Sequence, residues 1–258
     1  MPTDIHPQAI VAKEAVLDEG VSVGPFSVIE DKVRIGQGTF IGPGVLISGH
    51  TTIGQNCRIY KGAVIGSPPQ DLKYKGEKSF LVIGNNNIIR EFVTVNPGTE
   101  EGSYTRLGDN NLIMAYSHIA HNCSIGNGCI LANGATLAGH VSLEDRVVIG
   151  GLAAIHQFCR LGMLSIVGGC SKVVQDIPPF ALADGHPAKV RGINITGLKR
   201  AGFRREKVVL LRKIFKVLFF EGHTLDAALE IVKRSFTVSE EVEIIQKFIT
   251  SSQRGIAK

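Results

Sequence analysis

The chain has 258 residues, of which 44% are hydrophobic and only 6% are aromatic, with 30 glycines and no tryptophan. This length and hydrophobicity exclude a disordered chain, and the glycine-rich, aromatic-poor profile favours a tightly turned β architecture over an aromatic-packed globule. The formal net charge of +5 is compatible with an acidic partner, a phosphorylated substrate or a nucleic acid and does not choose among them.

The first residues and the apolar segments predict a cytoplasmic protein. Residues 1–6 lack the basic and apolar regions of a signal peptide. The longest apolar runs, such as residues 208–211, are far too short to cross a bilayer, so membrane insertion is not expected. The five cysteines have no scaffold-like spacing, which predicts that they are reduced.

Aliphatic residues recur every six positions over most of the chain. Steps of six from Ile5 to Val167 visit 28 positions, and 25 of them hold Ile, Leu or Val. The exceptions are Asp71, Glu77 and Glu101. They fall in two stretches, residues 66–82 and 96–106, which we expect to leave the repeat as loops.

This period predicts a three-sided parallel β-helix in which 18 residues make one turn and each face carries one short strand. The fifth position of each hexad supports the prediction, because it holds mostly small or β-branched residues such as Ala63, Val93 and Cys123. Ordinary antiparallel strands alternate with a period of two and need frequent hairpin turns, so they do not explain a fixed six-residue phase.

The repeat stops after Val173, and turn signals at residues 176–179 and 185–187 predict a connector. We therefore expect a β-helical domain over residues 1–194 and a helical domain over residues 195–258. One amphipathic helix is expected to begin near Phe203, and two more are expected to begin at the N-caps Thr224 and Ser239. The latter two should end near residues 234–235 and 254–255, and the helices should cover one end of the solenoid.

Histidines converge on one strip of this predicted solenoid. His121, Gly139 and Gln157 are 18 residues apart and should occupy one position in successive coils. His118, His140 and His156 lie beside them in the sequence. An imidazole there can act as a general base on a hydroxyl, or three histidines can bind zinc as in the gamma-class carbonic anhydrases, which share this fold. A third possibility, a structural solenoid that only binds a partner, does not account for the histidine strip.

Longer strings of sequence decide between these chemistries by resemblance. The string IAHNCSIGNGCILANGATLAGHVS, together with IHQFCRLG, VGGCSKVVQDIPP and GLKRAGF, closely resembles the bacterial UDP-N-acetylglucosamine O-acyltransferases of lipid A synthesis, from about residue 5 to Gly255. The resemblance implies a left-handed coil and a homotrimer with active sites between subunits. It also implies transfer of an (R)-3-hydroxyacyl group from acyl carrier protein to the glucosamine 3-hydroxyl of UDP-N-acetylglucosamine. No metal, nucleic acid or cofactor is implied beyond the phosphopantetheine of the carrier protein.

Carried over residue by residue, the resemblance implies that His121 is the general base and that the backbone N–H of Gly139 holds the thioester oxyanion. Glycine at that position would let a substrate approach the backbone closely. Gly169 matches the position that limits acyl chain length. The remaining implied contacts to the sugar, the nucleotide or the acyl arm are Asp71, Lys73, Asn96, His118, Asn122, His140, His156, Gln157, Asn194 and Arg200.

The chain departs from the family pattern at three places. The family usually has Asp where this chain has Asn122, His-Arg-Gly-Thr where it has Asn-Pro-Gly-Thr at residues 96–99, and often Arg where it has Ala201. An amide can hydrogen-bond an imidazole but cannot stabilise an imidazolium by charge. We therefore expect Asn122→Asp to be tolerated or to raise activity, and N-acyl transfer to a 3-amino UDP-sugar is an alternative to O-acyl transfer.

Overall fold

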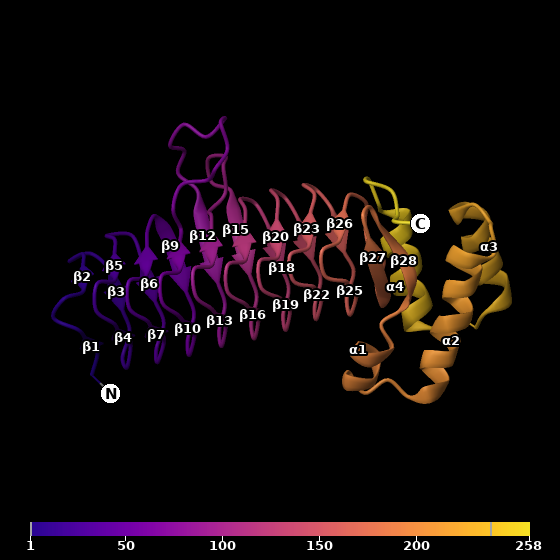
Figure 1. Cartoon of the computed structure of the whole chain (residues 1–258), viewed down its shortest axis with the longest axis horizontal. Coiled ribbons are helices and arrows are strands. Elements are labelled where there is room, and N and C mark those ends of the chain that lie inside the picture. The colour runs from indigo at the N-terminus through magenta and orange to yellow at the C-terminus, as the bar shows by residue number, and fades with distance from the viewer. Residues whose placement is uncertain (1, 238) are drawn as a thin grey trace.

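The computed structural model describes residues 2–237 and 239–258, and most of it is a three-sided solenoid of short strands (Figure 1). The chain visits the three faces in turn, so each strand of the repeat pairs in parallel with a strand one coil away. Val23 lies opposite Ile41, 18 residues later, as the six-residue period predicts. The expected parallel β-helix is confirmed.

Each face of the solenoid is one sheet. The first consists of β1 (Asp4–Ile5), β4 (Ser22–Val23), β7 (Phe40–Ile41), β10 (Arg58–Ile59), β13 (Ile88–Ile89), β16 (Leu112–Ile113), β19 (Ile130–Leu131), β22 (Val148–Ile149), β25 (Ile166–Val167), β27 (Ala181–Gly185) and β28 (Ala188–Ile193). The second consists of β2 (Ile10–Val11), β5 (Val28–Ile29), β8 (Leu46–Ile47), β11 (Val64–Ile65), β14 (Thr94–Val95), β17 (His118–Ile119), β20 (Thr136–Leu137), β23 (Ala154–Ile155) and β26 (Lys172–Val173). The third consists of β3 (Val16–Leu17), β6 (Arg34–Ile35), β9 (His50–Ile53), β12 (Phe80–Ile83), β15 (Tyr104–Leu107), β18 (Ser124–Ile125), β21 (Ser142–Leu143) and β24 (Arg160–Leu161).

The core runs along the axis of the solenoid. The second residue of each two-residue strand points inward, and Ile41, Ile59 and Ile89 stack there without solvent exposure. Small residues of the neighbouring position, such as Ala63 and Cys123, fill the remaining space. One large and one small inward side chain per hexad therefore fill a cross-section too narrow for two large ones.

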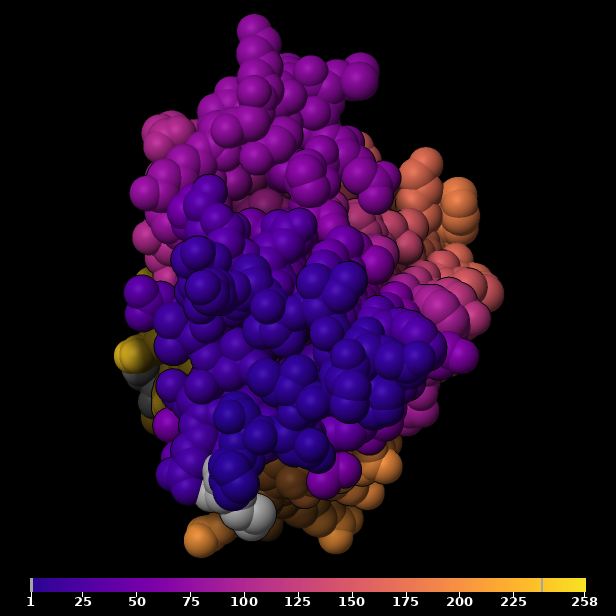
Figure 2. All heavy atoms as spheres, turned by 90° about the vertical axis from the view of Figure 1, so that its left-hand side faces the viewer, coloured from indigo at the N-terminus to yellow at the C-terminus, as the bar shows by residue number. Residues whose placement is uncertain are grey.

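Two loops leave the coil where the aliphatic repeat fails. Residues 66–79 connect β11 to β12, and residues 96–103 connect β14 to β15. Both rise from the same side of the solenoid (Figure 1), and Figure 2, which looks from the N-terminal end, shows this projection above the first coils. The predicted stretches end slightly too late, because β12 and β15 are four-residue strands that begin inside them.

The connector after the repeat is more regular than we expected. β27 pairs in parallel with β25 and continues the first sheet, and β28 pairs with β27 in an antiparallel hairpin. Residues 185–187, which signalled a break, form the turn of this hairpin. A turn signal between two short apolar segments is compatible with both structures, so the sequence did not distinguish a hairpin from an irregular connector.

The C-terminal helices are α1 (Ile195–Arg200), α2 (Arg205–Phe215), which continues into the π-helical turn η1 (Lys216–Phe220), α3 (Leu225–Ser235) and α4 (Glu240–Thr250). The hydroxyl of Thr224 caps α3 as predicted, since it accepts a hydrogen bond from the N–H of Ala227. These helices lie at the C-terminal end of the solenoid (Figure 1). None of the helices in the described residues has the length and apolar character needed to cross a bilayer.

The last predicted helix end is wrong by several residues, because α4 ends at Thr250 and the tail returns to the solenoid. The buried carboxylate of Asp176 accepts a hydrogen bond from the hydroxyl of Ser252, and the backbone N–H of Asp176 donates to the carbonyl of Gly255. These bonds anchor the tail against the connector, and the chain leaves the helical conformation before residues 254–255.

Candidate active site

The histidine strip lies along one corner of the solenoid. His121, Gly139 and Gln157 each follow a strand of the second sheet and occupy the same position in successive coils, as the 18-residue spacing predicted. The backbone N–H of His140 donates to the carbonyl of His121, and that of Phe158 donates to the carbonyl of Gly139. Hydrogen bonds between coils thus fix the heights of these residues along the corner.

A cavity opens beside this corner, between the two loops and the coils. The first loop contributes Asp71, Lys73 and Glu77, the second loop contributes Thr99, Glu100 and Glu101, and the corner contributes His121, His140, Gln157 and Phe158. A second cavity lies where the first loop meets the coils around His50, but none of the site residues predicted from sequence lines it. The chemistry therefore belongs to the first cavity.

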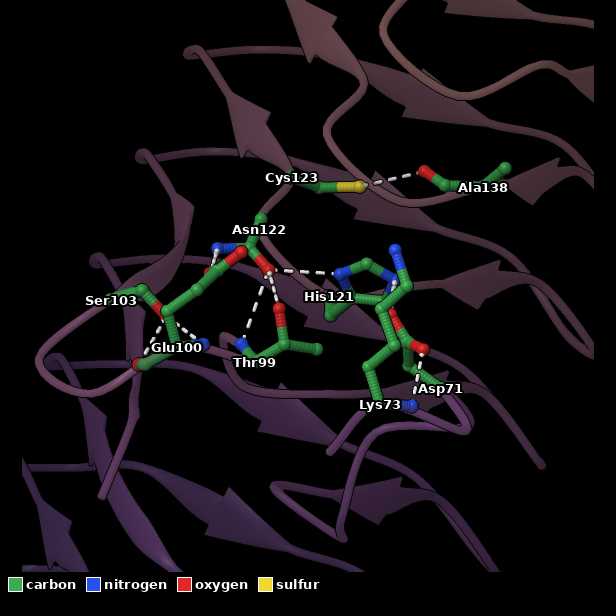
Figure 3. Close-up of polar contacts among 9 residues, drawn as sticks. All are labelled: Asp71, Lys73, Thr99, Glu100, Ser103, His121, Asn122, Cys123 and Ala138. Carbon is green, nitrogen blue, oxygen red and sulfur yellow. Dashed lines mark hydrogen bonds and ion pairs between the residues drawn. The ribbon is translucent and has the colours of Figure 1, made fainter. Parts of the chain in front are cut away.

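His121 is the central side chain of the cavity (Figure 3). Its imidazole is only 16% exposed, and its Nδ1 lies 2.8 Å from the Oδ1 of Asn122. Its Nε2 lies 3.7 Å from the Oδ2 of Asp71 on the first loop. One ring nitrogen is thus held by the corner of the solenoid, and the other faces the loop that closes the cavity.

The surroundings of Asn122 determine which nitrogen of His121 carries the proton. The N–H and the hydroxyl of Thr99 both donate to the Oδ1 of Asn122, at 3.2 and 2.9 Å, so the oxygen of the amide must be the end that faces the imidazole. An oxygen that only accepts requires a proton on Nδ1 of His121. In the neutral ring, Nε2 is then a free acceptor, which is the state that a general base needs.

Gly139 is buried directly against the ring of His121. A Cβ atom built on Gly139 would lie 2.5 Å from Nε2 of His121, closer than real Cβ contacts, and 3.1 Å from Nδ1. The φ of Gly139 is not positive, so turn geometry does not explain this glycine. Its backbone N–H has no hydrogen-bond partner among the described residues, which leaves a donor free next to a proton acceptor.

Two other histidines of the strip flank this pair. Burial lowers the pKa of His118, and its Nδ1 lies 2.7 Å from the hydroxyl of Thr94. Burial, and then the nearby His121, lower the pKa of His140, whose ring stacks on Phe158 and stands perpendicular to the ring of His121. Both imidazoles are therefore neutral hydrogen-bonding groups at neutral pH.

Two predicted contacts lie at the edge of the cavity or beneath it. His156 is exposed, and its Nδ1 lies 3.2 Å from a guanidinium nitrogen of Arg254 in the C-terminal tail. Asn96 is buried, and its amide donates to the carbonyls of Ser67 and Pro68, so it holds the base of the first loop. Its contact with a substrate stays a prediction.

Three predicted residues are not brought into the cavity by the fold of the single chain. Asn194 is buried, caps α1 by accepting from the N–H of Gly197, and donates to the carbonyl of Leu164. Arg200 is exposed in the last turn of the same helix. Gly169 follows β25 of the first sheet, at a different corner from His121.

Sequence reasoning missed Thr99 and Glu100, which hold the two ends of the Asn122 amide. Both belong to the second loop, where the repeat fails, so the 18-residue spacing could not relate them to His121. The family pattern considered in the sequence ends at Thr99, so it gave no signal for Glu100.

The buried cysteines in the described part of the chain are not placed to react at the site. Burial raises the pKa of Cys123 to about 12 and those of Cys129 and Cys159 to about 11, so these thiols are core side chains rather than nucleophiles. Within residues 2–237 and 239–258, no three His, Cys, Asp or Glu side chains are placed to hold a metal ion together.

Comparisons with known proteins agree over nearly the whole chain. The family model described as Udp N-acetylglucosamine O-acyltransferase, domain 2, matches residues 176–257, and the bacterial transferase hexapeptide model matches residues 32–68 and 104–139. A relative from Alkalilimnicola ehrlichii, named acyl-[acyl-carrier-protein]--UDP-N-acetylglucosamine O-acyltransferase, is 49% identical over 257 residues, which cover 99% of this chain and 100% of the relative. A relative of the same name from Nautilia profundicola is 50% identical over 200 residues, which cover 77% and 76% of the two chains.

Solved structures give the same picture. The UDP-N-acetylglucosamine acyltransferase from Bacteroides fragilis 9343 superposes with a TM-score of 0.96 at 40% identity, over 98% of this chain and 99% of that one. The structure from Acinetobacter baumannii superposes with a TM-score of 0.93 at 39% identity, over 98% and 99% of the two chains. Together with the hexapeptide match, these similarities support the left-handed coil that the repeat alone did not determine.

Proposed function

The chain belongs to the family of acyl-[acyl-carrier-protein]–UDP-N-acetylglucosamine O-acyltransferases, and we propose that it performs their reaction with His121 as general base and the Gly139 N–H as oxyanion donor. The reaction transfers an acyl group from acyl carrier protein to UDP-N-acetylglucosamine in lipid A biosynthesis. We further propose that the donor is an (R)-3-hydroxyacyl thioester, that no cofactor other than the carrier's phosphopantetheine takes part, and that the enzyme works in the cytoplasm.

One observation carries the mechanism: Asn122 holds the proton of His121 on Nδ1 and leaves Nε2 free in the cavity. Nε2 takes the proton of the glucosamine 3-hydroxyl while the hydroxyl oxygen attacks the thioester carbonyl. The N–H of Gly139 donates to the oxyanion that forms. When the intermediate collapses, the ester forms, the thiolate of phosphopantetheine leaves, and the imidazolium of His121 returns its proton to that thiolate.

Mass spectrometry of the product tests the proposed function. The enzyme is incubated with a mixed pool of (R)-3-hydroxyacyl carrier proteins and either UDP-N-acetylglucosamine or its 3-amino analogue. We expect an ester of the first acceptor and an equal amount of free carrier thiol. An amide formed much faster from the 3-amino analogue would contradict O-acyl transfer, and hydrolysis without acyl transfer would contradict both acceptors.

Activity should not depend on a bound metal. General-base attack on a thioester needs only a proton acceptor and an oxyanion donor, and we propose that His121 and Gly139 supply both. We expect kcat to be unchanged after dialysis against a strong chelator, with and without added zinc. Loss of activity on chelation, together with recovery in proportion to added zinc, would contradict this mechanism and favour a zinc-bound hydroxide.

We propose a homotrimer whose active sites lie between subunits. The support is the separation of the predicted site residues in one protomer, where Gly169 lies at a different corner from His121. If a corner of one subunit packs beside the His121 corner of its neighbour, both residues can border one groove. Asn194 and Arg200, which are outside the cavity of their own protomer, can reach a substrate by the same arrangement. Sedimentation equilibrium of the full chain measures the predicted stoichiometry.

Gly169→Met should shift the donor preference toward shorter acyl chains. A Cβ on Gly169 would meet only backbone atoms of Gly151, its carbonyl oxygen at 3.3 Å and its nitrogen at 3.9 Å, and φ is not positive, so the fold should accept a side chain after a small shift. A bulky side chain at the floor of the groove would displace the terminal methylenes, which costs about 1–3 kcal/mol. We expect kcat/KM for a fourteen-carbon donor to fall about tenfold relative to a ten-carbon donor. An unchanged ratio would mean that chain length is measured elsewhere.

A further inference from the structure

A carboxylate stands behind the amide that orients His121. The Oε2 of Glu100 accepts a hydrogen bond of 2.9 Å from the Nδ2 of Asn122, whose Oδ1 lies 2.8 Å from the Nδ1 of His121 (Figure 3). Family members usually carry a carboxylate at the Asn122 position itself. We propose that Glu100 is a positioning residue that acts on His121 through Asn122, so that an acid–amide pair replaces this single carboxylate. The inference rests on the proposed general-base role of His121.

The directions of the hydrogen bonds that link Glu100, Asn122 and His121 are fixed by groups that can only donate or only accept. The backbone N–H of Thr99 can only donate, so it holds the oxygen of the Asn122 amide toward the ring. The Glu100 carboxylate only accepts when ionised, so it holds the NH2 end away from the ring. Loss of either contact would allow the amide to rotate and would present an NH2 group to Nδ1, which selects the wrong tautomer of His121.

Glu100 is itself held in place by the turn of the second loop. Its backbone N–H donates to the hydroxyl of Ser103, at 3.0 Å, and that hydroxyl donates to the carbonyl of Glu100, at 2.7 Å. These two contacts use only the backbone of Glu100 and the hydroxyl of Ser103 (Figure 3). The carboxylate is hydrogen-bonded most strongly by Asn122 and less by its own backbone, Thr99 and Ser103. Glu100→Gln keeps the backbone contacts of the turn and an acceptor oxygen in the side chain, so the turn should stay intact.

The carboxylate is ionised at neutral pH. Burial raises the pKa of Glu100. Hydrogen bonds from Asn122 and from its own turn lower the pKa by more than burial raises it, so the net pKa is below the usual value. Negative charge thus lies one amide beyond the imidazole. It polarises the Asn122 amide and strengthens the hydrogen bond to Nδ1 as His121 gains a proton in the transition state. Asp71 is also near His121, but it faces Nε2 and cannot orient Nδ1.

This arrangement changes what Asn122→Asp should do. A carboxylate at position 122 would point one oxygen at Glu100, where the amide now donates a hydrogen bond. Two carboxylates within hydrogen-bond distance repel each other. The single substitution should therefore lower kcat, even though it restores the common family residue. Glu100→Gln in the same chain would supply an NH2 group to the new carboxylate and remove the repulsion. The double variant would then resemble the usual histidine–carboxylate pair.

The test is a double-variant cycle on the full-length enzyme, with kcat and KM measured for Glu100→Gln, Asn122→Asp and the double variant. We expect each single variant to lose about tenfold in kcat with little change in KM, and the double variant to return to within about threefold of wild type. Glu91→Gln is the matched control, because Glu91 is a partly exposed acid paired with Arg90 outside the cavity, and it should retain the wild-type kcat. Circular dichroism confirms that each variant is folded.

Three outcomes would overturn the proposal. Wild-type kcat in Glu100→Gln would show that the carboxylate does not act on His121. A raised KM at constant kcat would make Glu100 a substrate contact instead. If kcat of the double variant is no higher than that of the less active single variant, a carboxylate at position 122 and an amide at position 100 cannot replace the native pair. His121→Ala separates these failures from that of the proposed function: if it is inactive while Glu100→Gln is normal, only this inference is wrong.

Discussion

His121→Ala should lower kcat by about 10²–10⁴-fold, the usual effect of removing a general base. Nε2 of His121 is the free acceptor beside the unpartnered N–H of Gly139. His118 and His140 cannot replace it, because one is bonded to Thr94 and the other is stacked on Phe158. Steady-state rates with saturating carrier protein and sugar nucleotide measure the loss directly.

The substitution should not disturb the solenoid, because His121 lies at a corner and contributes no inward side chain. His50→Ala is the matched control, since His50 is also a partly buried histidine but lies outside the cavity. We expect His50→Ala to keep the wild-type kcat and both variants to keep the wild-type unfolding midpoint. Near-wild-type turnover by His121→Ala would exclude His121 as the base.

The regular coils were predictable because each follows from a purely local rule. A chain that turns after every sixth residue must bury one aliphatic side chain per hexad, so residues such as Ile41 and Ile59 mark the coils without any alignment. Handedness was not predictable from this pattern, since a six-residue period fits a coil of either hand. The left hand was predicted only from the resemblance to the acyltransferase family. The hairpin of β27 and β28 was missed because its pairing depends on the uncovered edge of β25, which is a tertiary feature.

In the candidate site, too, the residues that follow the repeat were predictable and the residues from a loop were not. The corner residues His121, Gly139 and Gln157 obey the 18-residue period, so their convergence was predictable. Thr99 and Glu100 come from a loop whose path depends on how it packs, and no spacing relates them to Asn122. For the same reason the sequence suggested that an aspartate at position 122 would be tolerated, whereas the neighbouring carboxylate predicts repulsion.

The structure shows that the glycine at position 139 leaves room for the ring of His121 and is not required by the backbone conformation. A glycine in a repeat with many turns suggests a residue that must adopt positive φ, as Gly134 does. Gly139 does not have positive φ, and its missing side chain matters because the imidazole of His121 occupies that space. This difference separates two kinds of glycine: one that the backbone requires and one that the active site requires.

Gly139→Ala should therefore lower kcat by about 10²–10³-fold while leaving the fold intact, a loss comparable to removal of an oxyanion-hole donor. The backbone of Gly139 can accept alanine without strain, but the new Cβ would lie 2.5 Å from the Nε2 of His121 and would displace the ring from its proton-accepting position. The same methyl group would narrow the approach of the thioester oxygen to the N–H. Equilibrium binding of UDP-N-acetylglucosamine should change little, because the overlap is with the base. A Gly139→Ala enzyme with wild-type kcat would show that the imidazole can move without loss of function, and the close packing of glycine and histidine would then have no catalytic role.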